Sequence, residues 1–96
     1  MHTIPVVEYE WDPAKAAENY RKHGVRFADA ALSVEDSLGF SAPDPDSAGE
    51  SRLLYLGADP SGRVLVTVYA VRGRAVRIIS SRKASRAERR AYEAGT

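Results

Sequence analysis

The sequence predicts a small α+β fold, with an antiparallel sheet covered by two N-terminal helices and followed by a C-terminal helix. Three observations carry this prediction: helix signals in the first third of the chain, three strand-like segments joined by short turns in the second half, and a helix start near residue 85. Strands joined by short turns pair antiparallel, and helices bury the apolar face of such a sheet. Residues 1–96 are expected to form one domain, because a chain of this length holds a single hydrophobic core.

The first helix is marked at both of its ends. Asp12 is a favoured N-cap, and Pro13 suits the first helical position because its missing N–H has no partner to lose there. Gly24 ends the helix after about His23, since glycine adopts the left-handed conformation at little cost. A short strand is expected before this helix, at Val6, Val7 and Tyr9.

The second helix is predicted by residue spacing. Its apolar residues stand at positions i, i+3, i+4 and i+7, which places them on one helical face: Phe27, Ala30, Ala31 and Val34. Residues 38–41 are expected to form a strand. Residues 42–49 are rich in Pro, Asp and Ser, which is typical of a loop.

Three strands and a helix are predicted in the second half. The turn signals are Asp59-Pro60-Ser61-Gly62 and the tight Arg72-Gly73 hairpin. Ser85 and Glu88 have the spacing of a capping box, so a last helix is expected to run to about Ala94. The strands are expected at residues 52–58, 63–71 and 74–80, the second being central because it is rich in valine.

The composition excludes several classes of protein and site. The chain has no cysteine, which excludes disulfides and thiolate metal sites. No apolar run approaches the ~20 residues of a spanning helix, and no basic residue precedes Lys15, unlike in a secretory signal. The acidic residues lack histidines at helical spacing, so no metal and no other cofactor is predicted. We therefore expect a cytoplasmic protein with no membrane segment.

The charges are divided unevenly along the chain. Residues 1–46 hold four Lys or Arg and nine Asp or Glu, a net charge of −5, whereas residues 47–96 hold ten and four, a net charge of +6. A folded chain of this kind has one cationic region that suits a polyanion or an acidic protein segment. Seven of these ten cations lie on or just beyond the predicted strands: Arg52, Arg63, Arg72, Arg74, Arg77, Arg82 and Lys83.

Strand alternation indicates which of these side chains act together. In the last strand, Val76, Ile78 and Ser80 are expected on one face and Arg77 and Ile79 on the other. An arginine in such a half-shielded place, near Arg52 of another strand, suits the gripping of a phosphate. The alternative for each arginine is a solvated surface charge.

Such cations are sufficient for RNA cleavage, because the 2′-hydroxyl of RNA supplies its own nucleophile. The protein then has to align the phosphate, neutralise the developing charge and move two protons. His23, Lys22, Glu50 and Tyr69 are the candidates for the proton transfers. His23 has an alternative role at the carbonyl end of the first helix, and Glu50 as a partner of Arg52. Trp11 either stacks on a base or packs in the core, and packing is favoured.

Taken together, these residues make the chain resemble the BrnT family of type II toxins, which has a RelE-like fold. The matching residues extend over about residues 8–92, in the expected order. They are Glu10-Trp11-Asp12, Lys15, Asn19, Lys22-His23-Gly24-Val25, Phe27, Ala30, Asp44, Glu50, Arg52, Leu56-Gly57, Gly62-Arg63, Arg77-Ile78-Ile79-Ser80, Arg82, Ala84, Glu88-Arg89 and Tyr92.

The resemblance implies a ribonuclease toxin that cleaves RNA, inhibits translation and arrests growth. It also implies a cognate BrnA-like antitoxin with a ribbon-helix-helix part, in a heterotetramer that binds operator DNA through the antitoxin. Carried over by position, the catalytic or phosphate-binding residues that the resemblance implies are first Lys22, Arg52, Arg77 and Arg82, and second His23 and Glu50. Further RNA contacts are expected at Lys15, Arg63, Arg74 and Lys83.

The chain departs from the family pattern in the loop before Arg52. Family members commonly have a His-Ser pair where this chain has Ser47-Ala48, and a doubled glutamate where it has Glu50-Ser51. Ser81 precedes Arg82 where alanine is frequent. An alternative function is therefore a catalytically weak or inactive module that keeps the fold and binds an antitoxin or RNA. A third is a structural or regulatory protein without RNA contact.

Overall fold

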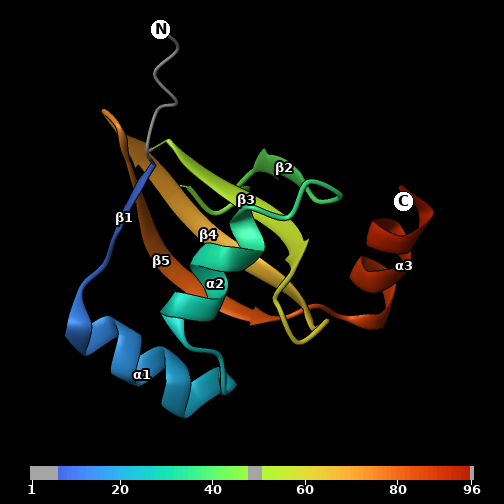
Figure 1. Ribbon diagram of the computed structural model, residues 1–96, viewed down its shortest axis with the longest axis horizontal. Helices are drawn as coiled ribbons and strands as arrows, with labels where there is room; N and C mark the ends of the chain where they lie inside the picture. Colours follow the sequence, from blue (N-terminus) through green and yellow to red (C-terminus); the bar gives the residue numbers. More distant parts are fainter. Residues whose placement is uncertain (1–6, 48–50, 96) are drawn as a thin grey trace, which may run out of the picture.

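The computed structural model describes residues 7–47 and 51–95. Within them, five strands form one twisted sheet in the order β1-β5-β4-β3-β2, and two helices lie on one of its faces (Figure 1). The helices α1 and α2 run over Pro13–His23 and Phe27–Val34, and α3 runs over Arg86–Ala94. The strands are β1 Glu8–Glu10, β2 Phe40–Pro43, β3 Arg52–Ala58, β4 Val64–Arg72 and β5 Ala75–Lys83.

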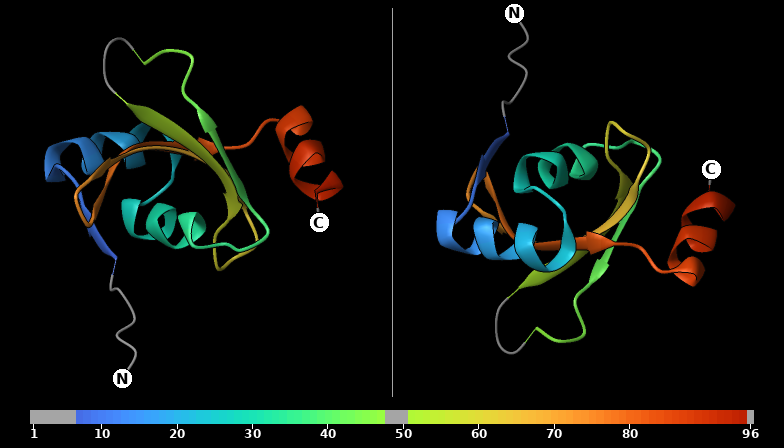
Figure 2. Two further views of the ribbon diagram at one scale, coloured as in Figure 1. Left: turned by 90° about the horizontal axis from the view of Figure 1, so that it is seen from above. Right: turned by 90° about the horizontal axis from the view of Figure 1, so that it is seen from below.

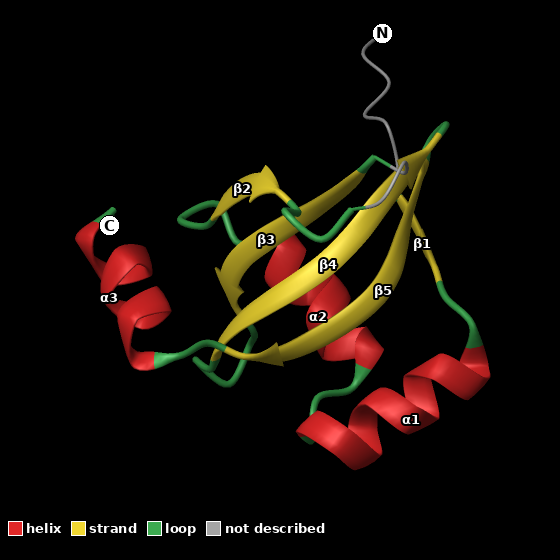
Figure 3. Cartoon of the chain, turned by 180° about the vertical axis from the view of Figure 1, so that it is seen from behind, coloured by secondary structure: helices red, strands yellow, loops and turns green. Residues whose placement is uncertain are grey.

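The sheet curves around α2, and α3 lies apart from the other two helices (Figure 2). Seen from behind, the sheet stands in front of α2, and α3 lies beyond one end of the sheet (Figure 3). The α+β fold predicted from the sequence is confirmed. One face of the sheet is closed by α1 and α2, so the opposite face is the one on which a site can form.

The pairing is antiparallel from β2 through β5, whereas β1 runs parallel to β5. β1 and β2 lie at opposite edges of the sheet, and the chain passes from one edge to the other through α1 and α2. Val6, which was expected in the first strand, lies outside the described residues. The second strand is Phe40–Pro43 and not residues 38–41.

The first and last helices begin at the capping residues predicted from the sequence, and the first ends at the predicted glycine. The Asp12 carboxylate accepts hydrogen bonds from the backbone N–H of Ala14 at 2.8 Å and of Lys15 at 3.4 Å. Gly24 has a φ of 67°, the left-handed conformation that favours glycine. Ser85 and Glu88 form both hydrogen bonds of the capping box at the start of α3.

The core lies between the sheet and the two N-terminal helices. It is formed by six buried side chains: Val25, Phe27, Ala30, Leu65, Tyr69 and Ile78. Trp11 packs edge-on against Phe27, with the ring centroids 6.1 Å apart and the ring planes at 82°. Trp11 therefore has the packing role that the sequence favours.

A β-bulge in β5 changes the faces of its last residues. Tyr69 pairs with Ile78 and Val68 with Ser80, so Ile79 is an extra residue without a direct partner on β4. The prediction that Ser80 shares a face with Ile78 is therefore wrong. Ser81 takes the buried position instead, and its hydroxyl lies 2.9 Å from that of Thr67. Beyond the bulge, β5 continues to Lys83, three residues further than predicted, because Val66 and Leu65 still offer pairing partners.

Among the helices of the described part of the chain, none combines the length and apolar character that crossing a bilayer requires.

Candidate functional site

The face of the sheet opposite α1 and α2 carries a cleft of about 470 Å³. Apolar side chains of the central strands line it together with Ile79 and Ser80 of the bulge. Its charged and titratable groups come from four parts of the chain: the end of α1, the connection after β2, the strands β3 and β5, and the first turn of α3. These groups are His23, Asp44, Asp46, Arg52, Arg82 and Glu88.

Strand register explains why three arginines face the same side. Arg52 pairs with Ala70 across β3 and β4, and Ala70 pairs in turn with Arg77 on β5. Paired residues point to the same face of a sheet, so Arg52 and Arg77 lie two strands apart, about 10 Å, on the face of the cleft. Arg82 joins them through its pairing with Val66, which lines the cleft.

The bulge decides the position of Arg82. In a regular strand, Arg82 would point to the same face as Ile78, since the two are four positions apart and side chains alternate with a period of two. Ile78 is buried in the core at 2% exposure. The extra residue at Ile79 reverses the alternation, so Arg82 turns to the cleft.

Arg77 shares the face but not the cleft. Its Nη1 atom lies 3.6 Å from Oε1 of Glu10 on the neighbouring strand β1, and both side chains are partly exposed. Of the three arginines that the sequence grouped together, Arg52 and Arg82 therefore meet in one cleft, and Arg77 lies to its side.

Arg82 is held by Glu88 in a two-point contact. Its Nη1 and Nη2 atoms donate hydrogen bonds of 2.8 Å and 3.0 Å to the two carboxylate oxygens. This contact, with the N–H and hydroxyl of Ser85, outweighs partial burial and lowers the pKa of Glu88 to about 2. The guanidinium group of Arg82 is thus oriented to bind two oxygens of one anion, and in this structure those two oxygens belong to Glu88.

The buried Asn19 fixes the end of α1 beside the cleft. Its Nδ2 donates to the carbonyl oxygens of Val25 at 3.0 Å and Ser81 at 2.9 Å, and its Oδ1 accepts from the N–H of Ser81 at 3.1 Å. The amide thus pairs with the backbone of β5 much as another strand would. His23, one turn further along α1, consequently reaches the cleft.

A second hollow of about 250 Å³ adjoins the cleft along α1. It shares His23, Ile79 and Ser80 with the cleft and is also lined by Lys15 and Lys22. Lys22 forms an ion pair with Glu18, with Nζ and Oε1 3.1 Å apart. Two of the predicted cations therefore lie on α1, in the hollow next to the cleft that holds Arg52 and Arg82.

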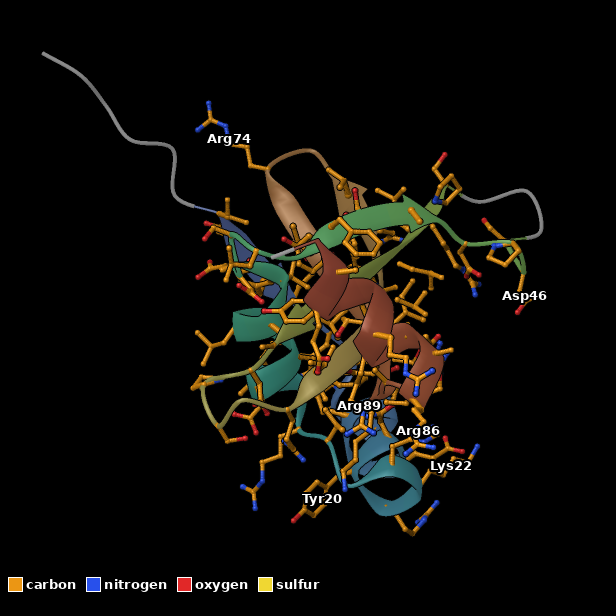
Figure 4. The ribbon with its side chains drawn as sticks, turned by 90° about the vertical axis from the view of Figure 1, so that its right-hand side faces the viewer. Tyr20, Lys22, Asp46, Arg74, Arg86 and Arg89 are labelled. Carbon is orange, nitrogen blue, oxygen red and sulfur yellow. The ribbon has the colours of Figure 1, made fainter. Side chains whose placement is uncertain are left out.

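The remaining predicted residues lie elsewhere. Arg63 is held by Asp59 at 2.9 Å and by the carbonyl of Gly24 at 3.2 Å. Lys83 pairs with Leu65, whose side chain belongs to the core, and so leaves the sheet on the face opposite Arg82. Two further residues have no place in the cleft: Arg74 lies in the β4–β5 turn, at the far end of the molecule from Lys22 (Figure 4), and Tyr69 is buried in the core. Glu50 lies outside the described residues.

The cleft also contains carboxylates that sequence reasoning did not place there. Asp44 and Asp46 belong to the connection after β2, on which Figure 4 labels Asp46. The Oδ1 atom of Asp44 accepts a hydrogen bond of 3.0 Å from the N–H of Asp46. Their turn-forming role was predicted, but their approach to Arg52 depends on the hydrogen bond between the Asp44 N–H and the Arg52 carbonyl. Glu88 was predicted only as a helix cap. Within residues 7–47 and 51–95, no group of three or more His, Asp and Glu side chains can hold a metal ion.

Comparison with known proteins gives the family. Residues 11–88 match the family model described as "Ribonuclease toxin, BrnT, of type II toxin-antitoxin system". The chain belongs to the BrnT family. Its structure is similar to the 1.1 Å crystal structure of the Brucella abortus ribonuclease toxin BrnT, with a TM-score of 0.63 and 26% sequence identity over 84% of this chain and all of that one. The comparison with curated proteins gave no match.

Membership of the BrnT family gives the chain its biological setting, a ribonuclease toxin of a type II system whose partner is an antitoxin. The site residues are not given by the family match. At position 47, where family members were expected to have a histidine, the hydroxyl of Ser47 accepts a 3.4 Å hydrogen bond from the N–H of Arg52. This BrnT chain therefore uses that position to join the loop to β3.

Proposed function

We propose that this BrnT-family chain cleaves RNA by attack of a ribose 2′-hydroxyl on the adjacent phosphodiester, without a metal ion. The observation that carries the proposal is the cleft that Arg52 and Arg82 line together. The two arginines come from non-adjacent strands, and His23 from α1 lines the same cleft. Two guanidinium groups on opposite sides of a phosphate hold it in place and neutralise the charge that builds up in the transition state.

The reaction needs one proton acceptor and one proton donor. The 2′-hydroxyl loses its proton as its oxygen bonds to phosphorus, and the 5′-oxygen gains a proton as its bond to phosphorus breaks. The product ends are a 2′,3′-cyclic phosphate and a 5′-hydroxyl. His23 is suited to either transfer, since an imidazole ring can both accept and donate a proton, and Asp44 and Asp46 supply carboxylates in the same cleft.

Phosphate binding at Arg82 requires an exchange. The Glu88 carboxylate occupies the two-point position on the guanidinium, so an RNA phosphate has to take its place. The helix that carries Glu88 has no buried residue, so a shift of α3 would leave the core closed and would act on surface contacts such as the hydrogen bond from the Tyr92 hydroxyl to the Asp36 carboxylate. Arg77, Lys15 and Lys22 extend the cationic surface on either side of the scissile phosphate.

In the cell, cleavage of RNA in the cytoplasm would inhibit translation and arrest growth. The proposed partner is a BrnA-like antitoxin with a ribbon-helix-helix part, which forms a heterotetramer with this chain and carries the binding to operator DNA. Family membership supports an antitoxin partner.

A second candidate function is a module that binds RNA or an antitoxin but has little or no cleavage activity. It is favoured by Ser47, which stands where a histidine was expected and bonds to the backbone of β3. This candidate predicts RNA binding at the same cleft with no product formed.

The test of the proposal is incubation of the purified protein with RNA in EDTA, with identification of the product ends. Cyclic phosphate ends that persist in the chelator are expected. Arg52→Ala, Arg82→Ala and His23→Ala are expected to lose activity, whereas Arg72→Ala removes an equal charge from the exposed end of β4 and is expected to keep it. A requirement for magnesium, or equal activity of all four variants, would contradict the mechanism.

A further inference from the structure

An apolar pocket of about 110 Å³ continues the cleft towards the edge strand β2. It is lined by Phe40, Ala42, Leu54, Leu56, Val66 and Glu88. The register explains this grouping, since Phe40 pairs with Leu56 and Leu56 with Val66, which places the three on the cleft face of the sheet. Arg82 ends the same row, about 14 Å from Phe40 at three strand spacings.

The pocket and the cleft are adjacent parts of one surface. Leu54, Val66 and Glu88 line both of them. The Glu88 carboxylate stands at their junction and is the group that an RNA phosphate has to displace from Arg82. A ligand whose phosphate takes the place of the Glu88 carboxylate at Arg82 therefore lies beside the pocket that Phe40 lines.

Phe40 itself is 44% exposed. A single exposed apolar side chain is ordinary on a protein surface. Phe40 differs because its exposed ring borders an apolar floor beside a cationic cleft, which is the arrangement by which proteins hold unpaired nucleotides: cations for the backbone and an aromatic ring for a base. At the other end of the cleft, Lys15 and Lys22 offer further contacts for the backbone.

We propose that Phe40 and its pocket receive an unpaired base of the RNA next to the phosphate held at Arg82, which makes single-stranded RNA the substrate. This inference rests on the proposed RNA cleavage in the adjoining cleft. A base that stacks on Phe40 cannot at the same time be stacked and paired in a helix, and the deep, narrow major groove of duplex RNA keeps its bases from such a ring.

The experiment measures binding of a fluorescent single-stranded oligonucleotide of 2′-deoxyriboses, which lacks the attacking hydroxyl and stays intact. Its abasic counterpart and an RNA duplex of the same sequence are the comparison ligands. Phe40→Ala is expected to weaken binding of the base-carrying strand about 5- to 150-fold. Phe40→Trp is expected to retain it, and Leu38→Ala, which shortens a neighbouring side chain that is 57% exposed and lines neither space, is expected to bind like the wild type.

The abasic strand separates a base contact from a general loss of structure. The wild type and Phe40→Ala are expected to bind it equally, and Arg82→Ala is expected to weaken both strands. Equal binding of the base-carrying strand by Phe40→Ala and the wild type would overturn the proposal that Phe40 binds a base. If RNA cleavage still depended on Arg82 in that case, the proposed function would be unaffected. An equal loss for both strands, tighter binding of the duplex, or a Phe40→Ala variant impaired only in binding purified antitoxin would likewise overturn the inference. The proposed function fails separately if the wild type neither binds nor cleaves RNA.

Discussion

Replacing Glu88 by glutamine is expected to strengthen the binding of nucleic acid. The wild-type carboxylate occupies both hydrogen-bonding positions of Arg82 that a phosphate would use, at 2.8 Å and 3.0 Å. Glutamine has nearly the same shape and keeps the capping function at the start of α3, but it lacks the charge that competes with a phosphate. The variant therefore removes the competitor and keeps the helix.

The magnitude follows from the pKa of Glu88. Its fall from 4.5 to about 2 corresponds to about 3.4 kcal/mol. The hydrogen bonds with Ser85 supply part of this shift. The side chains of Arg82 and Glu88 are 46% and 33% exposed, so solvent screening reduces the interaction between them to about 1 kcal/mol. A phosphate that no longer has to break this contact should bind about 5-fold more tightly.

The assay is fluorescence anisotropy with an uncleavable single-stranded oligonucleotide at pH 7 and low salt. The control is Glu93→Gln, which removes the same charge from the same helix at a position outside the cleft. Only Glu88→Gln is expected to bind more tightly than the wild type. If it bound as weakly as Glu93→Gln, or more weakly than the wild type, Glu88 would hold Arg82 in place for the phosphate rather than compete with it.

Three further outcomes are expected from urea unfolding. Asn19→Ala leaves the buried N–H and carbonyl of Ser81 without their partner and should cost about 2–4 kcal/mol, and an unchanged midpoint would contradict the role of this amide. Gly57→Ala places a methyl group against the Ser33 carbonyl and the Tyr55 ring and should cost about 1–3 kcal/mol, whereas Gly95→Ala meets only ordinary contacts and should cost little. Because folding lowers the pKa of Glu88 from 4.5 to about 2, its contribution to stability is complete above pH 4.5 and is lost as the pH falls towards 2, so wild-type stability should fall more steeply over that window than that of Glu88→Gln; parallel curves would contradict this.

The helix ends were predictable because their causes are local. The Asp12 carboxylate reaches the N–H groups of the next residues, and Gly24 supplies the left-handed conformation without help from any distant residue. The valine-rich pattern likewise predicted β4 as a central strand, since only a strand covered on both sides by neighbours buries so many branched side chains.

The site depended on the partner that each charged side chain has in the folded chain. Arg63 has the same side chain as Arg82, yet Asp59 and the carbonyl of Gly24 hold it away from the cleft. Glu88 has a recognisable capping position, but its contact with Arg82 depends on how β5 leads into α3. Which cations share a cleft follows from these partners, and sequence patterns do not contain them.

The face on which a strand residue lies is set by register, and register belongs to the pair of strands. The sequence by itself determined the α+β class, the positions of the helices and the cationic character of the second half. Tertiary structure decided that β1 joins β5 in parallel and that the extra residue at Ile79 turns Arg82 to the open face. A single unpaired residue reverses every side chain beyond it, so only the paired sheet brings Arg52 and Arg82 into one cleft with His23.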